Sequence, residues 1–259
     1  VFASMRSGDY TGLTSPANAK EWKIDTEVQT NGTVPLSNNP TYPENGDWLY
    51  LIAVAPQASS YSEDEGKVTY TLAGQTDLMY ASQISGNRWD GSRFSNTDGT
   101  GTPLTYKHLL TQLTFKAMKK VTGGLSVKVK KITVTTTNSV ILALTNGETS
   151  FSGSGELSLE LPDGGTEISG TTATSLSNSL LLPPLTGTSD AYKLTVETSI
   201  GTFKDLEITA QSDGGSLSFA GGTSHEITLN IGDKELGISS VTVSGWVPVI
   251  QNADLNLVE

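Results

Sequence analysis

Cysteine is absent from the 259-residue sequence. Structural disulfides, thiolate nucleophiles and cysteine-ligated zinc are therefore excluded within these residues. A chain of this length can bury a large apolar core, so its stability does not depend on such cross-links.

Basic residues are few, because 16 Lys and Arg stand against 27 Asp and Glu, which gives a formal net charge of −11. A nucleic-acid-binding protein needs a basic surface to meet phosphates, and an anionic membrane surface attracts the same kind of charge. We therefore predict neither partner. We interpret the acidic excess as a source of solubility rather than of a specific acidic role.

Long hydrophobic runs are also missing, since no stretch reaches the ~18 apolar residues of a membrane-spanning helix. The sequence starts at Val1 rather than at Met. We expect a mature or trimmed form from which a targeting segment was removed.

The sequence is rich in β-strand patterning. Apolar residues make up only 36% and charged residues 17%, with many Gly, Thr and Ser, a composition typical of all-β extracellular proteins. Leu113, Phe115 and Ala117 alternate with polar residues, which is the period of a half-buried strand. The run 47–55 is the most hydrophobic and ends at Pro56, so it predicts a central strand buried on both faces. These signals predict an all-β fold of sandwiches or barrels.

Three finer features are predicted in the strands. The apolar parity switches between Val129 and Ile132, which predicts a β-bulge at Lys130-Lys131. Asn146-Gly147 predicts a hairpin turn. Six of the 16 basic residues lie between positions 116 and 131, and we favour the interpretation that they guard exposed sheet edges over a ligand-binding patch.

The stretch 76–118 separates two regions of different composition. Before it the chain is rich in Pro and Asn, and after it the chain is rich in Thr and Ser with regular alternation. Residues 1–21, in contrast, are polar and weakly patterned. We predict two β-domains, at 1–122 and 123–259.

The sequence contains none of the common enzyme motifs that we considered. The two histidines, His108 and His225, accompany no Gly-x-Ser-x-Gly elbow, phosphate-binding loop or His-Glu-x-x-His pattern. We predict that His108 is packed and hydrogen-bonded, and that the chain has no catalytic residues, bound metal or cofactor. Paired carboxylates of the glycosidase kind have no fixed sequence spacing, so that chemistry stays open.

Sugar binding is suggested by the four tryptophans, Trp22, Trp48, Trp89 and Trp246. Trp48 and Trp246 sit on apolar strands and are predicted to belong to the core. Trp89 lies in the polar loop 87–91, where an exposed indole would favour recognition. The alternative, which we favour from sequence alone, is that Trp89 pins its own loop.

Several segments together resemble the fimbrillin-like proteins of Bacteroidetes. Residues 41–56 (TYPENGDWLYLIAVAP) resemble a strand of that family, and residues 75–81 (QTDLMYA) resemble one of its signatures. Residues 104–115, with His108 and Leu113, and the ending from Ile227 to Trp246 follow in the same order. The resemblance covers roughly 41–246.

The resemblance implies two tandem transthyretin-like, Greek-key β-sandwich domains and a subunit of type V pili. It implies export as a lipoprotein precursor, display at the outer membrane, and assembly into fimbriae as stalk, anchor or tip. In such proteins a protease specific for Arg or Lys removes an N-terminal strand, and the groove accepts a strand from the next subunit.

On this resemblance, Arg6 is a candidate maturation site, and the partners are other fimbrial subunits. The candidate strand-exchange residues lie in the first predicted strand and in the tail: Trp22, Ile24, Val28, Val247, Val249, Leu255 and Leu257. The alternative function is a monomeric cell-surface adhesin that binds host or dietary glycan or protein, with Trp89 as candidate recognition residue.

Overall fold

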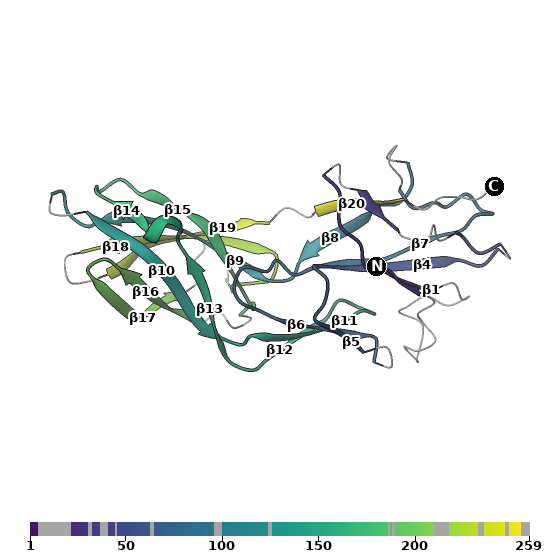
Figure 1. Cartoon of the computed structure of the whole chain (residues 1–259), viewed down its shortest axis with the longest axis horizontal. Coiled ribbons are helices and arrows are strands. Elements are labelled where there is room, and N and C mark those ends of the chain that lie inside the picture. Colours follow the sequence, from purple (N-terminus) through teal and green to yellow (C-terminus); the bar gives the residue numbers. More distant parts are fainter. Residues whose placement is uncertain are drawn as a thin grey trace.

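The computed structural model shows an elongated molecule built from β-strands (Figure 1). It describes residues 1–4, 22–30, 33–36, 41–44, 46–62, 65–95, 100–123, 126–185, 187, 190–209, 218–232, 236–246 and 249–254. Regular structure in these ranges consists of strands and one 3-10 turn, η2 (Pro162–Gly164). The all-β prediction is confirmed. No helix in the described ranges has the length and apolar character needed to cross a membrane.

Two sheets occupy the right-hand half of Figure 1, which carries most of the N-terminal residues. Sheet I has the order β2 (Trp22–Lys23), β1 (Phe2–Ser4), β4 (Leu49–Ala55), β7 (Met79–Gly86), β8 (Leu104–His108), β20 (Val249–Asp254) and β3 (Thr33–Pro35). Sheet II has the order β12 (Thr149–Ser152), β11 (Ser139–Ala143), β6 (Lys67–Thr71) and β5 (Ser60–Ser62).

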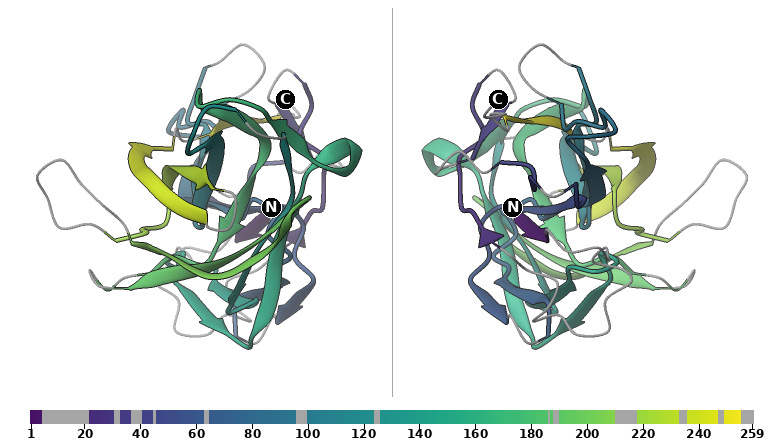
Figure 2. Two further views of the ribbon diagram at one scale, coloured as in Figure 1. Left: turned by 90° about the vertical axis from the view of Figure 1, so that its left-hand side faces the viewer. Right: turned by 90° about the vertical axis from the view of Figure 1, so that its right-hand side faces the viewer.

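Two further sheets form the left-hand half of Figure 1. Sheet III has the order β13 (Gly155–Glu160), β10 (Val127–Thr136), β16 (Ala191–Thr198) and β17 (Gly201–Thr209), with β14 (Thr166–Ile168) also paired to β10. Sheet IV has the order β15 (Thr174–Leu182), β9 (Thr111–Lys119), β18 (Thr223–Ile231) and β19 (Leu236–Gly245). The end-on views of Figure 2 show the strands arranged around the long axis.

Two apolar cores meet at β4. Leu49, Leu51 and Ala53 belong to the smaller core, which packs on one face of sheet I. Ile52, on the opposite face of the same strand, belongs to a larger core that also holds residues of sheets II, III and IV, such as Phe115. Because alternate side chains of a strand point to opposite faces, β4 is buried on both. The prediction for the run 47–55 is confirmed.

The predicted bulge and hairpin are both present. The register of β10 against β16 shifts between Val129 and Lys131, so one residue is inserted at the predicted position. The strands β11 and β12 pair antiparallel around Asn146-Gly147, where Gly147 has a φ of 74°. A positive φ of this kind is the reason for glycine in such turns.

The edge-guarding interpretation of the lysines is wrong for β9 and β10. Each of these strands is paired on both sides, so neither forms a sheet edge. Two of their lysines instead form ion pairs with neighbouring strands, Lys116 with Glu226 at 2.8 Å and Lys131 with Glu160 at 3.2 Å. The sequence shows which residues are lysines, but the pairing of distant strands decides which strands are edges.

The sheets combine strands from both sides of residue 122. β6 pairs with β11, β9 lies in sheet IV, and β20 returns to sheet I. The division of the chain into domains at 1–122 and 123–259 stays a prediction.

Candidate functional site

The strand β1 lies inside sheet I, between β2 and β4. Phe2 is paired with both Lys23 of β2 and Ile52 of β4, and both pairings are antiparallel. Val1 continues the ladder, because the backbone nitrogen of Val1 donates to Ile24 O at 2.8 Å and Ile24 N donates to Val1 O at 2.9 Å. We call this strip of the sheet the β1 lane.

In the β1 lane, the short strand β1 lies beside the longer strand β4. β1 pairs with Tyr50, Leu51 and Ile52, whereas β4 extends over seven residues to Ala55. The end of β4 therefore runs beyond the three-residue strand that occupies its edge.

A cleft of about 750 Å³ opens where the β1 lane continues along the end of β4. It is lined by Val1, residues 23–28, Val34, residues 54–61 and Tyr106. The registers of β2 and β4 against β1, extended beyond Val1, place Asp25 opposite Val54. The two walls of the cleft therefore prolong the two strands that flank β1.

The wall formed by residues 24–30 is fixed at both of its ends. Ile24 is bonded to Val1, and Gln29 N donates to Thr33 O at 2.8 Å. Between these points the Thr26 hydroxyl donates to Pro35 O at 2.5 Å. Residues 24–29 have no regular secondary structure, and Val28 is 47% exposed.

The opposite wall follows the cis peptide bond Ala55–Pro56. The hydroxyl of Tyr70 donates to Pro56 O at 3.0 Å and fixes this corner from the adjacent sheet. Burial raises the pKa of the Tyr70 hydroxyl, so it stays a protonated donor.

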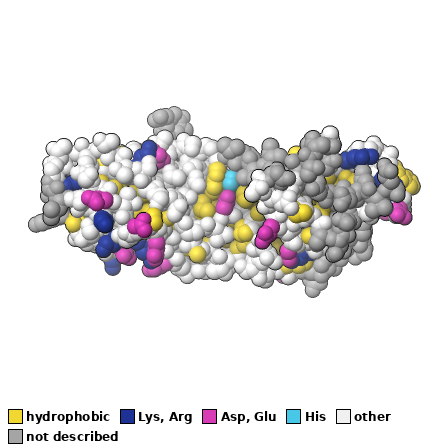
Figure 3. Space-filling model, turned by 45° about the horizontal axis from the view of Figure 1, so that its top comes forward, with side chains coloured by type: hydrophobic (Ala, Val, Ile, Leu, Met, Phe, Trp, Pro, Cys, Tyr) yellow, Lys and Arg dark blue, Asp and Glu magenta, His cyan; other side chains and the backbone are white. Residues whose placement is uncertain are grey.

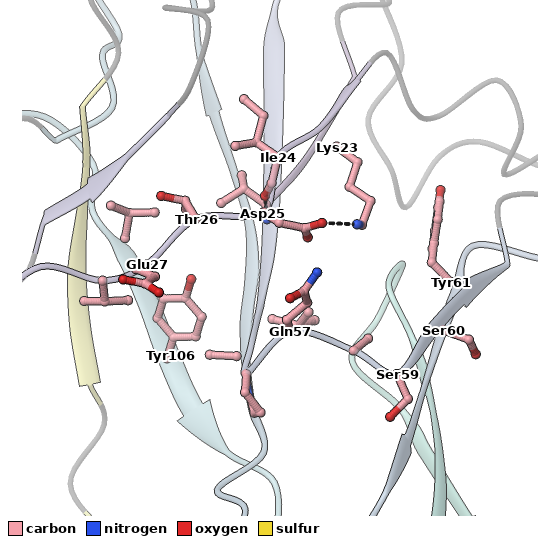
Figure 4. Close-up of a pocket in the computed structure, with 17 residues that line it drawn as sticks. Lys23, Ile24, Asp25, Thr26, Glu27, Gln57, Ser59, Ser60, Tyr61 and Tyr106 are labelled. Atoms are coloured by element: carbon pink, nitrogen blue, oxygen red, sulfur yellow. Dashed lines mark hydrogen bonds and ion pairs between the residues drawn. The ribbon is translucent and has the colours of Figure 1, made fainter.

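The cleft is lined by neutral polar groups and by charged groups of both signs. Figure 4 shows Gln57 pointing toward Asp25, whose carboxylate forms an ion pair with Lys23 at 2.6 Å. Burial raises the pKa of Tyr106 to about 12, so its hydroxyl is neutral and able to donate at physiological pH. A cleft with amide, hydroxyl and opposite charges suits an extended peptide backbone better than a strongly charged ligand.

The C-terminal tail also enters sheet I, on the other side of β8. β20 pairs antiparallel with β8, where Val249 is opposite Tyr106, and parallel with β3, where Ala253 is opposite Val34. In the sheet order the strands β4, β7 and β8 separate this tail from the β1 lane.

The approach to β20 is held by two stacked rings, which we call the His108–Trp246 clasp. The ring centroids are 3.6 Å apart, and the planes differ by 3°. His108 Nδ1 lies 2.9–3.0 Å from the carboxylate oxygens of Asp77, and Trp246 N donates to Gly222 O at 3.1 Å. His108 is buried, so the prediction of a packed, hydrogen-bonded histidine is confirmed.

The structure gathers only part of the predicted exchange set. Trp22 pairs through its backbone with Ala3, and Ile24 is buried beside Val1. The first strand is shorter than predicted, because β2 ends at Lys23. Val249 begins β20. Val28 lies beyond β2 and lines the cleft. The other predicted positions lie outside the described residues: Arg6, Val247, Leu255 and Leu257.

Sequence reasoning missed β1 and the wall formed by residues 54–61. The apolar Val1-Phe2-Ala3 is the one local signal for β1, and three residues are too few to show a period. His108 and His225 do not line the cleft, and the described residues contain no cluster of three or more potential metal ligands.

A family model described as fimbrillin-like matches residues 2–246. A search of curated proteins finds no significant match.

Solved structures with a TM-score of 0.58 share the fold at low identity, and a further structure matches at a lower TM-score. A proposed cell adhesion protein of Bacteroides uniformis matches with a TM-score of 0.58 and 14% identity, over 95% of this chain and 90% of that chain. One from Bacteroides ovatus matches with a TM-score of 0.58 and 16% identity, over 95% and 86%. The tip fimbrial protein Mfa3 of Porphyromonas gingivalis, truncated at its C-terminus, matches with a TM-score of 0.44 and 10% identity, over 95% and 98%.

Proposed function

Because this chain belongs to the fimbrillin-like family, we propose that it is a structural subunit of surface fimbriae that joins its neighbours by β-strand addition. The observation that carries the proposal is the β1 lane, in which a short segment that precedes Arg6 forms an inner strand of sheet I between β2 and β4. A strand that replaced β1 would pair with both of these neighbours.

Cleavage after Arg6 is the proposed first step. It would detach the segment that contains β1, since β1 ends at Ser4. The freed edge of β4 would then present a row of backbone donors and acceptors, which is a template for another strand. Removal of Val1 would also uncover the smaller core, in which Val1 packs with Ile24.

The replacement strand would restore the pairing that cleavage removes. β1 pairs with Tyr50, Leu51 and Ile52 of β4, and an incoming strand would pair with the same backbone. Each backbone hydrogen bond that it forms contributes about 0.5–1.5 kcal/mol. Side chains that point toward Leu51 and Ala53 would provide sequence selection, because those residues face the smaller core.

We propose the tail of a neighbouring subunit, residues 247–259, as the incoming strand. Its residues 249–254 already form a strand in sheet I through backbone pairing with β8 and β3. The same segment would pair with the β1 lane of the next molecule. Export as a lipoprotein and a role as stalk, anchor or tip are further parts of this proposal.

An arginine-specific protease tests the mechanism, because the sequence has only three arginines, Arg6, Arg88 and Arg93. The cleaved protein is checked by mass spectrometry for loss of residues 1–6, then mixed with a fluorescent peptide of residues 247–259. We expect peptide binding and oligomers in light scattering after cleavage. The control Arg6→Gln, which keeps the other two sites, is expected to show neither.

The proposal is wrong if a chain that has lost residues 1–6 and remains folded by circular dichroism neither binds the peptide nor assembles. That result would leave the alternative, an adhesin that acts as a monomer.

A further inference from the structure

The loop after β7 is built around the buried side chain of Asn87. Its amide nitrogen donates to Gly46 O at 2.8 Å, while its amide oxygen accepts from the backbone nitrogens of Trp89 at 2.7 Å and Asp90 at 3.2 Å. Asn87 is 5% exposed, so these bonds are shielded from water. One asparagine therefore fixes the backbone on both sides of Trp89.

The remainder of the loop is fixed by further hydrogen bonds. Asp90 Oδ1 accepts from Ser92 N at 2.8 Å, and Asn87 N donates to Ser92 O at 2.8 Å. Beyond the loop, Phe94 N donates to the Tyr42 hydroxyl at 2.8 Å, and the two rings stack with centroids 5.5 Å apart. The loop is thus held by backbone and polar side-chain contacts that do not involve the indole.

The indole itself is 69% exposed, more than any other large hydrophobic side chain in the described ranges. On one side it lies against Gly46, where a Cβ would come within 2.4 Å of the ring atom Cε3. The ring is therefore backed by glycine backbone and open to solvent on its remaining surface. The hydrogen bonds that fix the loop do not use the indole, so we favour a Trp89 that is presented by its loop, with Gly46 as its one backing contact.

An indole that is mostly exposed and takes no part in the hydrogen bonds of its loop requires another explanation. Leaving a large aromatic side chain in water forgoes the stabilisation that burial would provide. We propose that Trp89 is the stacking platform of a carbohydrate-binding site. Its ligand is a neutral hexopyranose, such as a terminal galactose or N-acetylglucosamine, on a larger glycan.

The chemistry of the loop fits a sugar ring. The axial C–H groups of a pyranose carry partial positive charge, and the face of an indole is the negative part of its quadrupole. Polar side chains beside the indole in sequence, Arg88, Asp90 and Ser92, provide partners for hydroxyl groups. The loop carries charges of both signs, with Arg88 and Arg93 against Asp90, so it offers no strongly basic cluster for an acidic glycan and we assign a neutral sugar.

A protein partner fits less well. The core of a protein–protein interface needs a group of large apolar residues around its anchor. The other exposed large hydrophobics belong to other elements: Val28 lines the cleft, Ile141 is on β11 of sheet II, Ile200 lies between β16 and β17 of sheet III, and Val121 follows β9 of sheet IV. On the face shown in Figure 3, hydrophobic side chains occur in small groups among uncharged and charged ones.

The position of the loop leaves it accessible. β7 begins with Met79 beside His108, near the middle of the molecule, and ends at Gly86, from which the loop starts. In Figure 1, β7 runs toward the end that lies away from sheets III and IV. The loop that carries Trp89 therefore leaves β7 at the end of that strand away from sheets III and IV, and this inference does not depend on strand addition.

The test uses the full chain, biotinylated and presented as a fluorescent streptavidin tetramer on a glycan array, since one stacking contact gives weak monovalent binding. We expect binding to glycans that end in a neutral hexopyranose, and competition by millimolar free galactose or N-acetylglucosamine. Trp89→Ala is expected to lower the signal about tenfold or more, whereas Trp89→Phe keeps part of it. Ile200→Ala, at a side chain 46% exposed, is the matched control and leaves binding unchanged.

Unchanged circular dichroism and thermal midpoint of Trp89→Ala would establish that its loop is intact. The proposal is overturned if the wild-type chain binds no neutral glycan, or if its binding survives Trp89→Ala. Trp89-dependent binding to a glycoprotein that persists after enzymatic removal of its glycans would overturn it in favour of a protein partner.

Discussion

Acidification is expected to destabilise this protein through His225. The side chain is 0% exposed, and its ring lies 4.6 Å from that of Phe219. The Thr223 hydroxyl donates to Ala220 O at 2.6 Å, so His225 Nε2 must carry the hydrogen in its 2.9 Å contact with that hydroxyl. Nδ1 is then bare, and it has no hydrogen-bond partner among the described residues. A second proton would create a buried charge on an unpaired N–H.

The direction and size of the effect follow from the pKa. Burial lowers the pKa of His225 from 6.5 to about 4. The unfolded chain therefore takes up a proton near pH 6.5, and the folded chain does so only near pH 4. The stability contributed by neutral His225 is complete above pH 6.5 and is lost as the pH falls from about 6.5 to about 4. At 1.36 kcal/mol per pKa unit, the loss between pH 8 and pH 5 is about 2 kcal/mol.

Urea unfolding of the wild type and of His225→Leu at pH 8 and pH 5 measures this contribution. The 27 acidic residues titrate in both proteins, so their effect cancels in the comparison. The variant is expected to be about 1 kcal/mol less stable than the wild type at pH 8, through its missing bond to Thr223. At pH 5 it is expected to be about 1 kcal/mol more stable, because it does not lose the roughly 2 kcal/mol that the wild type loses on acidification. Equal losses on acidification would refute the reasoning, as would an NMR titration that gave His225 an ordinary pKa.

Three further substitutions test the architecture. Trp246→Ala removes the ring stacked on His108 and is expected to accelerate amide hydrogen exchange in β20 about three- to tenfold, since such pairs contribute about 0.5–1.5 kcal/mol; unchanged exchange would show that the clasp does not hold the tail. Phe115 is 1% exposed, and Phe115→Ala is expected to lower the free energy of unfolding by about 3–5 kcal/mol. The control Val121→Ala, at an exposed side chain, is expected to lower it by less than about 0.5 kcal/mol. Similar urea midpoints for the two variants would contradict the assigned core. Gly46 has a φ of 83°, and a Cβ added there would lie 2.4 Å from the Trp89 ring. Gly46→Ala is therefore expected to lower the free energy of unfolding by about 1 kcal/mol or more and to shift tryptophan fluorescence. A spectrum and stability like those of the wild type would argue against that packing.

Local patterns predicted the elements whose cause is local. The apolar run of β4 indicates burial on both faces, and the parity switch before Ile132 indicates the bulge, because side-chain direction follows residue spacing. The lysines of β10 were misinterpreted because an edge is a property of the whole sheet. The two strands that flank β10, β13 and β16, are remote from it in the sequence.

The candidate site was predictable only in outline. Trp22 and Ile24 were expected in a strand-exchange region, and they do lie beside the β1 lane. The cleft joins residues 23–28 to residues 54–61, and β1 exists because distant β4 accepts it. Pairings between remote segments leave no mark in local composition, so such a site becomes visible only in the folded chain.

The orientation of β4 has a mechanical consequence. Figure 1 shows β4 and β7 running along the length of the molecule. Hydrogen bonds between antiparallel strands are perpendicular to the strands, so tension applied along the long axis shears many of them at once instead of peeling them apart one by one. A partner strand lodged beside β4 would be loaded in this same resistant direction, and a chain of such molecules would withstand the drag of flowing liquid.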